Sequence, residues 1–275
     1  TPGPIANFTS DTVCEGDSTT FTDLSQFTPP LGVEIQTWLW DFGDGNTSTD
    51  QNPTHLYSNA GVYNAVLIVT DTNGCQGYDT NVVIVDTLPI ANFSFTDTIC
   101  LGDTTFFSDL SVNTSGNINN WQWNFGDGNT STDINPYHIY SNPGTYTVTL
   151  TVTDDNLCTH TDTQTVIIRP NPIASFTATT VCVGDTTELI STSISDSIYS
   201  NIAGTINSWQ WNFGDGNGYG DDLDIIQHAY TSDGPYLVTL IVTDQYGCDT
   251  EVSDSVYVTP GPIANFTSDT VCEGD

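Results

Sequence analysis

The chain has 275 residues, a formal net charge of −33 and one basic side chain besides its histidines, Arg169. Because Lys and Arg are the side chains that neutralise phosphate, this composition predicts no nucleic-acid partner and makes an anionic membrane a poor one. No apolar stretch is long enough to span a bilayer, so no membrane span is expected in this segment.

A five-residue motif recurs along the chain. It reads Pro-Ile-Ala-Asn-Phe, or Pro-Ile-Ala-Ser-Phe in one copy, and it begins at Pro4, Pro89, Pro172 and Pro262. Intervals of this length fit one small β-sandwich each. We therefore predict successive repeats at residues 1–86, 87–170 and 171–258.

A longer period lies above the repeats. Thr1–Asp17 is identical to Thr259–Asp275. We interpret residues 259–275 as the start of a second, identical three-repeat unit, and we expect the natural protein to be much longer. Adjacent copies of the same repeat are the first partners that this pattern predicts, followed by identical neighbouring chains in a filament.

The second repeat has the clearest strand pattern. Apolar residues alternate along Asn119–Phe125 and along Tyr146–Val152, and this period of two predicts half-buried β-strands. Further strands are expected at Ala91–Phe95, Thr104–Leu110 and Thr163–Ile168. The short linkers Val85–Pro89 and Ile168–Pro172 contain proline and should be stiff.

One hexapeptide identifies the fold family. Trp40–Gly45, Trp123–Gly128 and Trp211–Gly216 resemble the signature of the polycystic-kidney-disease (PKD) domain, and the resemblance covers nearly the whole chain. It implies an all-β fold of tandem Ig-like, antiparallel β-sandwiches in a linear array. Asn124 and Asn212 stand where the family usually has Asp.

The cysteines add a second, narrower resemblance. Cys-x-Gly-Asp before the second predicted strand of each repeat, and Gly-Cys or Leu-Cys before the last, resemble repeats in giant secreted surface proteins of gliding bacteria that serve as adhesins. Regularly spaced cysteines in a β-rich chain also predict disulfides and an oxidising, extracellular setting. The cysteines are Cys14, Cys75, Cys100, Cys158, Cys182, Cys248 and Cys272.

Two pairing schemes are open. The first joins the two cysteines of a repeat, such as Cys14 with Cys75. The second is staggered and joins Cys14 to Cys158 and Cys100 to Cys248. We favour the staggered scheme, because a whole strand, roughly 25 Å long, separates the two cysteines of one sandwich, and a disulfide needs Cα atoms within about 7 Å. Bridges between chains remain a third alternative.

In the staggered scheme some cysteines lack a partner within this chain. Cys75 would pair with a preceding repeat and Cys182 with a following one. Cys272 repeats Cys14 and would wait for the next unit.

Carboxylates near the signature are candidate Ca²⁺ ligands, because Ca²⁺ takes six to eight oxygen ligands and would offset the charge. The alternative is that the same Asp and Asn side chains close tight turns. The candidate metal ligands are Asp41, Asp44, Asp127 and Asp215.

Candidate glycosylation sites are Asn46 and Asn129, which head Asn-x-Ser/Thr triplets, and Thr12 and Thr98, in Asp-Thr-aliphatic triplets. His55, His138 and His228 recur at one position and are interpreted as packed structural residues, while His160 is expected to be exposed. The six tryptophans are interpreted as core rather than as a carbohydrate platform.

These features predict a non-enzymatic protein, because no catalytic arrangement stands outside the repeat pattern. The expected function is a structural segment of a long extracellular fibre or adhesin stalk. The alternative is a carbohydrate-binding or spacer module of a secreted hydrolase.

Overall fold

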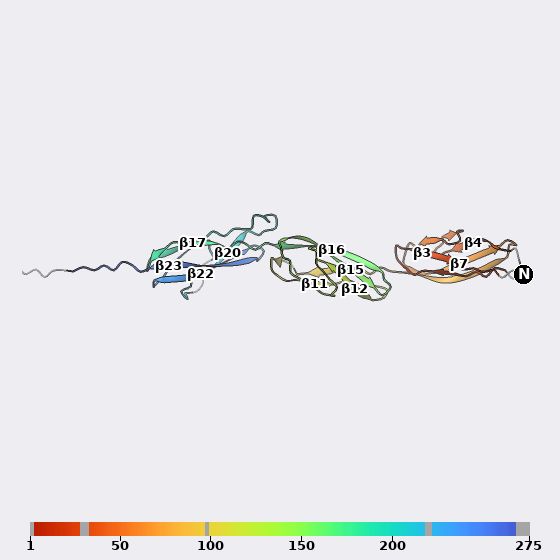
Figure 1. The fold of residues 1–275 in the computed structure, drawn as a ribbon, viewed down its shortest axis with the longest axis horizontal. Coiled ribbons are helices and arrows are strands. Elements are labelled where there is room, and N and C mark those ends of the chain that lie inside the picture. The colour runs from red at the N-terminus through yellow and green to blue at the C-terminus, as the bar shows by residue number, and fades with distance from the viewer. Residues whose placement is uncertain (1–2, 28–32, 97–98, 218–221, 268–275) are drawn as a thin grey trace, which may run out of the picture. The chain divides into compact units, whose positions relative to one another are not determined.

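A computed structural model describes residues 3–27, 33–96, 99–217 and 222–267. The chain divides into two compact units, and the division runs through the second repeat. One unit comprises Thr1–Phe95, Phe106–Pro136 and Thr147–Gln164, and the other comprises Thr96–Thr105, Tyr137–Tyr146 and Thr165–Asp275. Figure 1 shows strands and loops in both, and none of the described residues form a helix of the length and apolar character needed to cross a membrane.

The described strands of the first repeat form two sheets. One has the order β1-β3-β6 and the other β2-β8-β7-β4-β5. The bounds are β1 Phe8–Ser10, β2 Val13–Cys14, β3 Ser18–Asp23, β4 Ile35–Asp41, β5 Thr47–Ser48, β6 Thr54–Leu56, β7 Gly61–Asp71 and β8 Gln76–Asp86.

The third repeat follows the same plan. Its described strands form sheets with the orders β17-β19-β21 and β18-β23-β22-β20. The bounds are β17 Phe176–Ala178, β18 Val181–Cys182, β19 Thr186–Ser191, β20 Ile206–Asn212, β21 Ile225–Ala229, β22 Gly234–Asp244 and β23 Asp249–Thr259.

The second repeat has sheets with the orders β14-β11-β9 and β10-β16-β15-β12-β13. Its strands are β9 Phe93–Phe95, β10 Ile99–Cys100, β11 Thr105–Asp109, β12 Ile118–Asn124, β13 Thr130–Ser131, β14 Tyr137–His138, β15 Gly144–Asp154 and β16 Thr159–Arg169. The prediction of all-β tandem sandwiches is confirmed.

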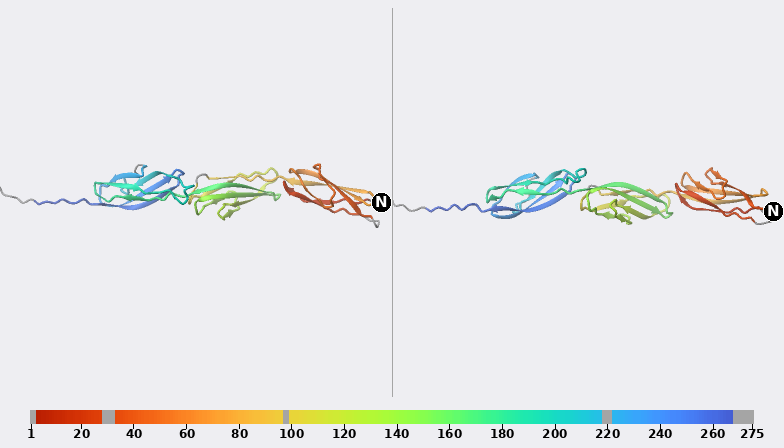
Figure 2. Two further views of the ribbon diagram at one scale, coloured as in Figure 1. Left: turned by 90° about the horizontal axis from the view of Figure 1, so that it is seen from above. Right: turned by 45° about the horizontal axis from the view of Figure 1, so that its top comes forward.

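Alternation of side chains builds each core. In β7, Ala65, Leu67 and Val69 are fully buried, because successive side chains of a strand point to opposite faces. They pack against Phe8 and Phe21 from the facing sheet. The long strands of each repeat run beside one another in both turned views of Figure 2.

The signature tryptophans belong to this core. Trp40, Trp123 and Trp211 are fully buried, and each indole N–H donates to a backbone carbonyl. The preceding tryptophans are half-buried at the edge of the core: Trp38 donates to Asp23 and Trp121 to Asp109. Their packing is that of core residues rather than of an exposed platform.

Candidate functional site: cysteines at the repeat boundaries

The first cysteine of each repeat lies in a two-residue strand that pairs in parallel with the end of the last long strand. Cys14 lies opposite Asp86, the last residue of β8. The next turn is closed by the Asp17 N–H, which donates to the Cys14 carbonyl at 2.9 Å. Cys14 is therefore held where the chain leaves the first repeat.

The second cysteine follows a hairpin at the opposite end of the last long strand. Cys158 lies between β15 and β16, and Asp154, a fully buried carboxylate, organises its loop. Asp154 Oδ1 accepts the N–H groups of Asn156 at 3.0 Å and Cys158 at 2.9 Å. Because β16 has 11 residues, the two ends of a sandwich are separated by roughly 36 Å at about 3.3 Å per residue.

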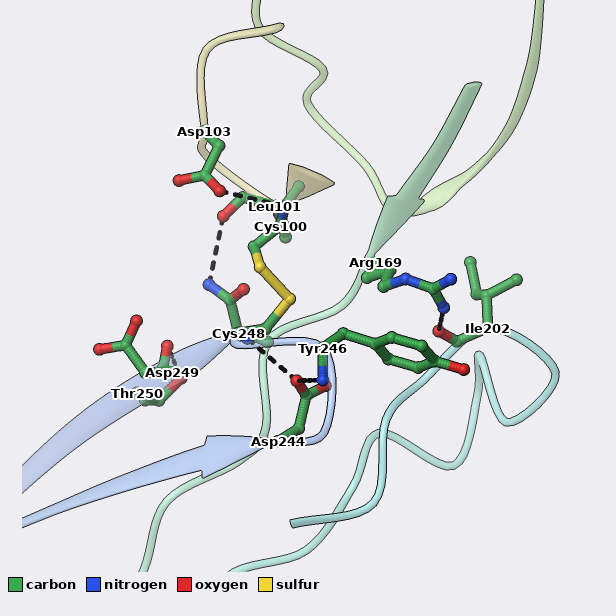
Figure 3. Close-up of a disulfide and its surroundings, with 11 residues drawn as sticks. Cys100, Leu101, Asp103, Arg169, Ile202, Asp244, Tyr246, Cys248, Asp249 and Thr250 are labelled. Carbon is green, nitrogen blue, oxygen red and sulfur yellow. Dashed lines mark hydrogen bonds between the residues drawn. A yellow bond between two sulfur atoms is a disulfide. The ribbon is translucent and has the colours of Figure 1, made fainter. Parts of the chain in front are cut away.

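Four of the described cysteines form disulfides across repeats. Cys14 is bonded to Cys158 with Cα atoms 5.6 Å apart, and Cys100 is bonded to Cys248 with Cα atoms 5.5 Å apart. These are the pairs of the staggered scheme. Each disulfide joins the short strand beside the last residues of one repeat to the last hairpin of the next repeat. Figure 3 shows the second disulfide.

A cation packs beside the second disulfide. The Arg169 guanidinium carbon lies 3.4 Å from the centre of the Tyr246 ring, and its Nη1 donates to the Ile202 carbonyl at 2.7 Å (Figure 3). The Asn171 side chain also donates to the Leu101 carbonyl at 3.2 Å. Arg169 thus packs against the Tyr246 hairpin of the third repeat.

The first boundary uses other side chains. The Thr87 and Thr114 hydroxyls lie 3.2 Å apart. Leu88 and Leu157 line a cavity of about 310 Å³ together with Cys14. Leu157 has a φ of 68°, and among the described residues it is the one non-glycine residue with a positive φ.

The remaining cysteines differ in state. Cys75 and Cys182 are free among the described residues, and each is half-buried. Cys272 lies outside the described residues.

The candidate metal ligands close turns. Asp41 Oδ1 accepts the Gly43 N–H at 2.9 Å. Asp44, Asp127 and Asp215 each accept both the backbone N–H and the side-chain amide of the Asn two residues later. No group of three His, Cys, Asp or Glu residues within the described ranges could hold a metal ion, so the Ca²⁺ site stays a prediction.

Asp44 and Asp215 also bind the recurring histidine. His55 Nε2 donates to Asp44 Oδ2 at 2.7 Å, and His228 Nε2 donates to Asp215 Oδ2 at the same distance. Each imidazole stacks on a phenylalanine ring, with centres 4.1 Å apart for Phe42 and 3.9 Å apart for Phe213. The described contacts of His55 and His228 are those of packed structural residues.

Titration behaviour follows from this packing. Partial burial raises the pKa of Asp44 and of Asp215, but the hydrogen bonds from the histidine and asparagine outweigh it, and the net pKa lies below its ordinary value. Burial raises the pKa of Tyr230 to about 12, with the Asp215 charge adding to the shift. These turns therefore keep their carboxylates ionised.

The candidate glycosylation sites differ in accessibility. Thr12 is exposed in a loop. Asn46 and Asn129 are exposed residues whose side-chain nitrogens donate to Asp44 and Asp127 at 3.0 Å. Thr98 lies outside the described residues.

The expectation for His160 was wrong. Its Nδ1 accepts the Ala91 N–H at 3.0 Å, and the residue is half-buried. The contact ties the last strand to the start of the second repeat, which is a long-range contact that no local pattern indicates.

Sequence reasoning missed the carboxylates that organise the cysteine hairpins. Asp71, Asp154 and Asp244 are buried, and each accepts the N–H of the cysteine four residues later at 2.9 Å. The available signal was the Val-Thr-Asp sequence at the same distance before Cys75, Cys158 and Cys248.

A family comparison agrees with this repeated geometry. The profile of the PKD domain matches residues 1–85, 86–168 and 169–260. The chain belongs to the PKD domain family. The PKD resemblance of the signature hexapeptides is thereby confirmed, and the three matched segments account for nearly all of the chain.

Known proteins share parts of this PKD array. It is 44% identical over 80 residues to a microbial collagenase of Vibrio alginolyticus, covering 27% of this chain and 10% of that protein. It is 34% identical over 124 residues to the pre-pro-metalloprotease PrtV of Vibrio cholerae serotype O1, covering 44% of this chain and 13% of that protein. The chain thus spans only a small part of these relatives' length.

A solved structure, the PKD1 domain of the Vibrio cholerae metalloprotease PrtV, is 37% identical to this chain. The match covers 30% of this chain and 96% of that domain, with a TM-score of 0.28.

Proposed function

We propose that this PKD array is a load-bearing, non-enzymatic segment of a long extracellular fibre or adhesin stalk. The observation that carries the proposal is the pair of disulfides that join consecutive repeats, Cys14–Cys158 and Cys100–Cys248. Such bonds persist in oxidising compartments, which supports a location outside the cytoplasm. The identity of Thr1–Asp17 with Thr259–Asp275 supports repetition of the whole unit.

The position of the cysteines supports a role under tension. Force that crosses the Cys14–Cys158 bond reaches the second repeat at Cys158 and passes along β16 to the next linker. Force that arrives through the first linker reaches Cys100 and crosses to Cys248, at the start of β23. Neither route through the second repeat needs β11–β15 to unfold.

Single-molecule stretching between the two termini tests this role. In the fully extended chain the shortest covalent path crosses from Cys14 to Cys158, returns along the backbone to Cys100 and crosses to Cys248. This path omits roughly 170 residues, so the oxidised chain should be shorter than the reduced chain by roughly 600 Å at about 3.5 Å per residue. A Cys14→Ser, Cys100→Ser variant should extend like the reduced chain. The matched control, Cys75→Ser with Cys182→Ser, removes only free thiols and should behave as the parent chain.

Equal extension of the oxidised and reduced chains would contradict the proposal. So would a parent gene that contains one three-repeat unit beside a catalytic domain, because a fibre requires many units.

That second result would favour another candidate. Similarity to segments of a microbial collagenase and of PrtV supports the spacer form of this alternative, a non-catalytic module in a secreted hydrolase. The length of the array in the parent gene separates the two candidates.

A further inference from the structure

Two free cysteines occupy positions that are equivalent to bonded ones. Cys182 is the first cysteine of the third repeat, as Cys14 and Cys100 are of the first and second. Cys75 is the second cysteine of the first repeat, as Cys158 and Cys248 are of the others. We therefore compare the backbone pairing and hydrogen bonds around these free cysteines with those around the bonded ones.

Cys182 has the local structure of the bonded first cysteines. It lies opposite Thr259 in a parallel pair with the end of β23, as Cys14 lies opposite Asp86 and Cys100 opposite Arg169. The following turn is the same: the Asp185 N–H donates to the Cys182 carbonyl at 3.0 Å, and the Asp103 N–H donates to the Cys100 carbonyl at 3.0 Å.

Cys75 has the local structure of the bonded second cysteines. Its N–H donates to the buried Asp71 at 2.9 Å, as the N–H groups of Cys158 and Cys248 donate to Asp154 and Asp244. The difference is exposure, because Cys158 is 1% exposed and Cys248 is 0% exposed, whereas Cys75 is half-buried.

The sequence indicates which repeat follows Cys182. Thr259–Asp275 repeats Thr1–Asp17, so the chain continues after the third repeat with the sequence of the first. We take the following repeat to continue as the first repeat does, so that its hairpin cysteine is the equivalent of Cys75. The bonded pairs lie 144 and 148 residues apart, and Cys182 lies at a similar separation from Cys75 of a directly following copy.

We infer that Cys182 forms a disulfide with Cys75 of the following copy of this three-repeat unit. This inference rests on the proposed function and names the partner: a second copy of this chain, joined in the order third repeat to first repeat. The bond makes the covalent cross-linking continuous, so that every repeat boundary carries both a peptide linker and a disulfide.

The chemistry needs an oxidant, which we take to be a low-molecular-weight disulfide such as oxidised glutathione. The Cys182 thiolate attacks one sulfur of that disulfide, releases one thiol and forms a mixed disulfide. The Cys75 thiolate then attacks the protein sulfur and releases the second thiol. Two protein thiols are oxidised to one disulfide, and the small disulfide is reduced to two thiols.

The test uses a tandem chain in which one full unit, residues 1–258, precedes a second copy, residues 1–275, with the final Cys272 changed to Ser. Each copy has free Cys75 and Cys182, so the two copies hold four such thiols. After equilibration with oxidised glutathione and an excess of reduced glutathione, which returns unpaired cysteines from the mixed disulfide to the thiol, and removal of both reagents, thiol titration should find two, because the junction bond removes one from each copy. Peptide mapping without reductant should recover Cys182 of the first copy with Cys75 of the second.

A matched variant with Cys75→Ser in the second copy only should leave Cys182 of the first copy free, while the Cys14–Cys158 and Cys100–Cys248 bonds persist. Four thiols in the parent tandem chain, or recovery of Cys182 with any other cysteine, would overturn the inference. The proposed function would still stand in that case if stretching showed the disulfide-limited extension described above, so the two failures are distinguishable.

Discussion

The boundary that Cys14 and Cys158 join and the boundary that Cys100 and Cys248 join surround the same covalent link with different side chains. The first has Leu88 and Leu157 beside the disulfide. The second has Arg169 over Tyr246. The backbone around each cysteine is nearly the same at both, which indicates that the disulfide and its hairpin form the common joint and that the neighbouring contacts are local adjustments.

The largest expected effect comes from removing the carboxylate that organises each hairpin. Asp154 accepts two backbone N–H groups and also the Asn113 side chain at 2.9 Å, whereas Asp244 has the two backbone bonds. Leaving such buried donors unpaired costs about 1–3 kcal/mol each. Asp154→Ala should therefore destabilise its hairpin by about 1 kcal/mol more than Asp244→Ala destabilises the equivalent hairpin.

Peptide-resolved hydrogen exchange of β15–β16 and β22–β23 measures the two effects separately. Asp249→Ala, at an exposed position beside the second hairpin, serves as the control and should leave both unchanged. Equal losses for the Asp154 and Asp244 variants would show that the Asn113 bond adds nothing.

The next largest effect is expected from Leu157, which lies in the β15–β16 hairpin where the β22–β23 hairpin has Gly247. It has a φ of 68°, where the other two hairpins have Gly74 and Gly247 with φ of 82° and 86°. This left-handed conformation costs a non-glycine residue about 1 kcal/mol, and Leu157 is 79% exposed, so few contacts are lost with its side chain. Leu157→Gly should raise the melting temperature of the second repeat by about 4–8 °C.

The reverse change is the matched test. A Cβ at Gly247 would meet nothing within 4 Å, so Gly247→Leu should lower the melting temperature of the third repeat through backbone strain alone. A Leu157→Gly variant that melts at a lower temperature than the parent would mean that the Leu157 contacts at the first boundary outweigh the strain.

Arg169 provides a smaller difference, confined to the second boundary. Arg169→Gln removes the cation from the Tyr246 ring, an interaction worth about 0.5–2 kcal/mol. We expect dithiothreitol to reduce Cys100–Cys248 roughly three to ten times faster in this variant. Cys14–Cys158 is the internal control, and an equal acceleration of both bonds would refute a local role for Arg169.

The smallest expected difference is the loss of stability in acid of the first repeat compared with the third. Burial raises the pKa of Asp23, but hydrogen bonds from Ser25, Gln51 and Trp38 outweigh it, and the net pKa lies below its ordinary value. The third repeat has Ser191 in that place. A carboxyl with a lowered folded-state pKa contributes stability that is present above about pH 4 and is lost as the pH falls through the folded-state pKa.

The first repeat should therefore lose slightly more stability than the third between about pH 4 and pH 2. Peptide-resolved hydrogen exchange on either side of this window measures the difference. Asp23→Ser, which copies the third repeat, should abolish it. A persistent difference in that variant would assign the acid sensitivity to other carboxyl groups.

Much of the fold could be predicted because it depends on alternation. Val148, Leu150 and Val152 were expected to face inward, and each is fully buried. The short strands β2, β10 and β18 were not predicted, because two residues are too few to show a period. Their parallel pairing depends on contacts with the distant end of the last strand.

The site was predictable to a similar degree. The length of one strand and the reach of a disulfide argued against bridges within a repeat and so favoured the staggered cysteine pairs. The roles of Asp154, Leu157 and His160 did not follow, because a buried hydrogen bond, a positive φ and a long-range contact each depend on the folded chain. The repeated Asp four residues before a cysteine was visible, but its function as an acceptor was not.

The overlap of the two disulfides has one more consequence. Cys100 lies inside the segment that the Cys14–Cys158 bond closes, and Cys158 lies inside the segment that the Cys100–Cys248 bond closes. One or two breaks of the backbone between Cys14 and Cys248 therefore leave the ends of the molecule connected. The ends separate only after three cuts, one between Cys14 and Cys100, one between Cys100 and Cys158, and one between Cys158 and Cys248. A surface exposed to foreign proteases would keep its reach after damage that severs an ordinary string of domains.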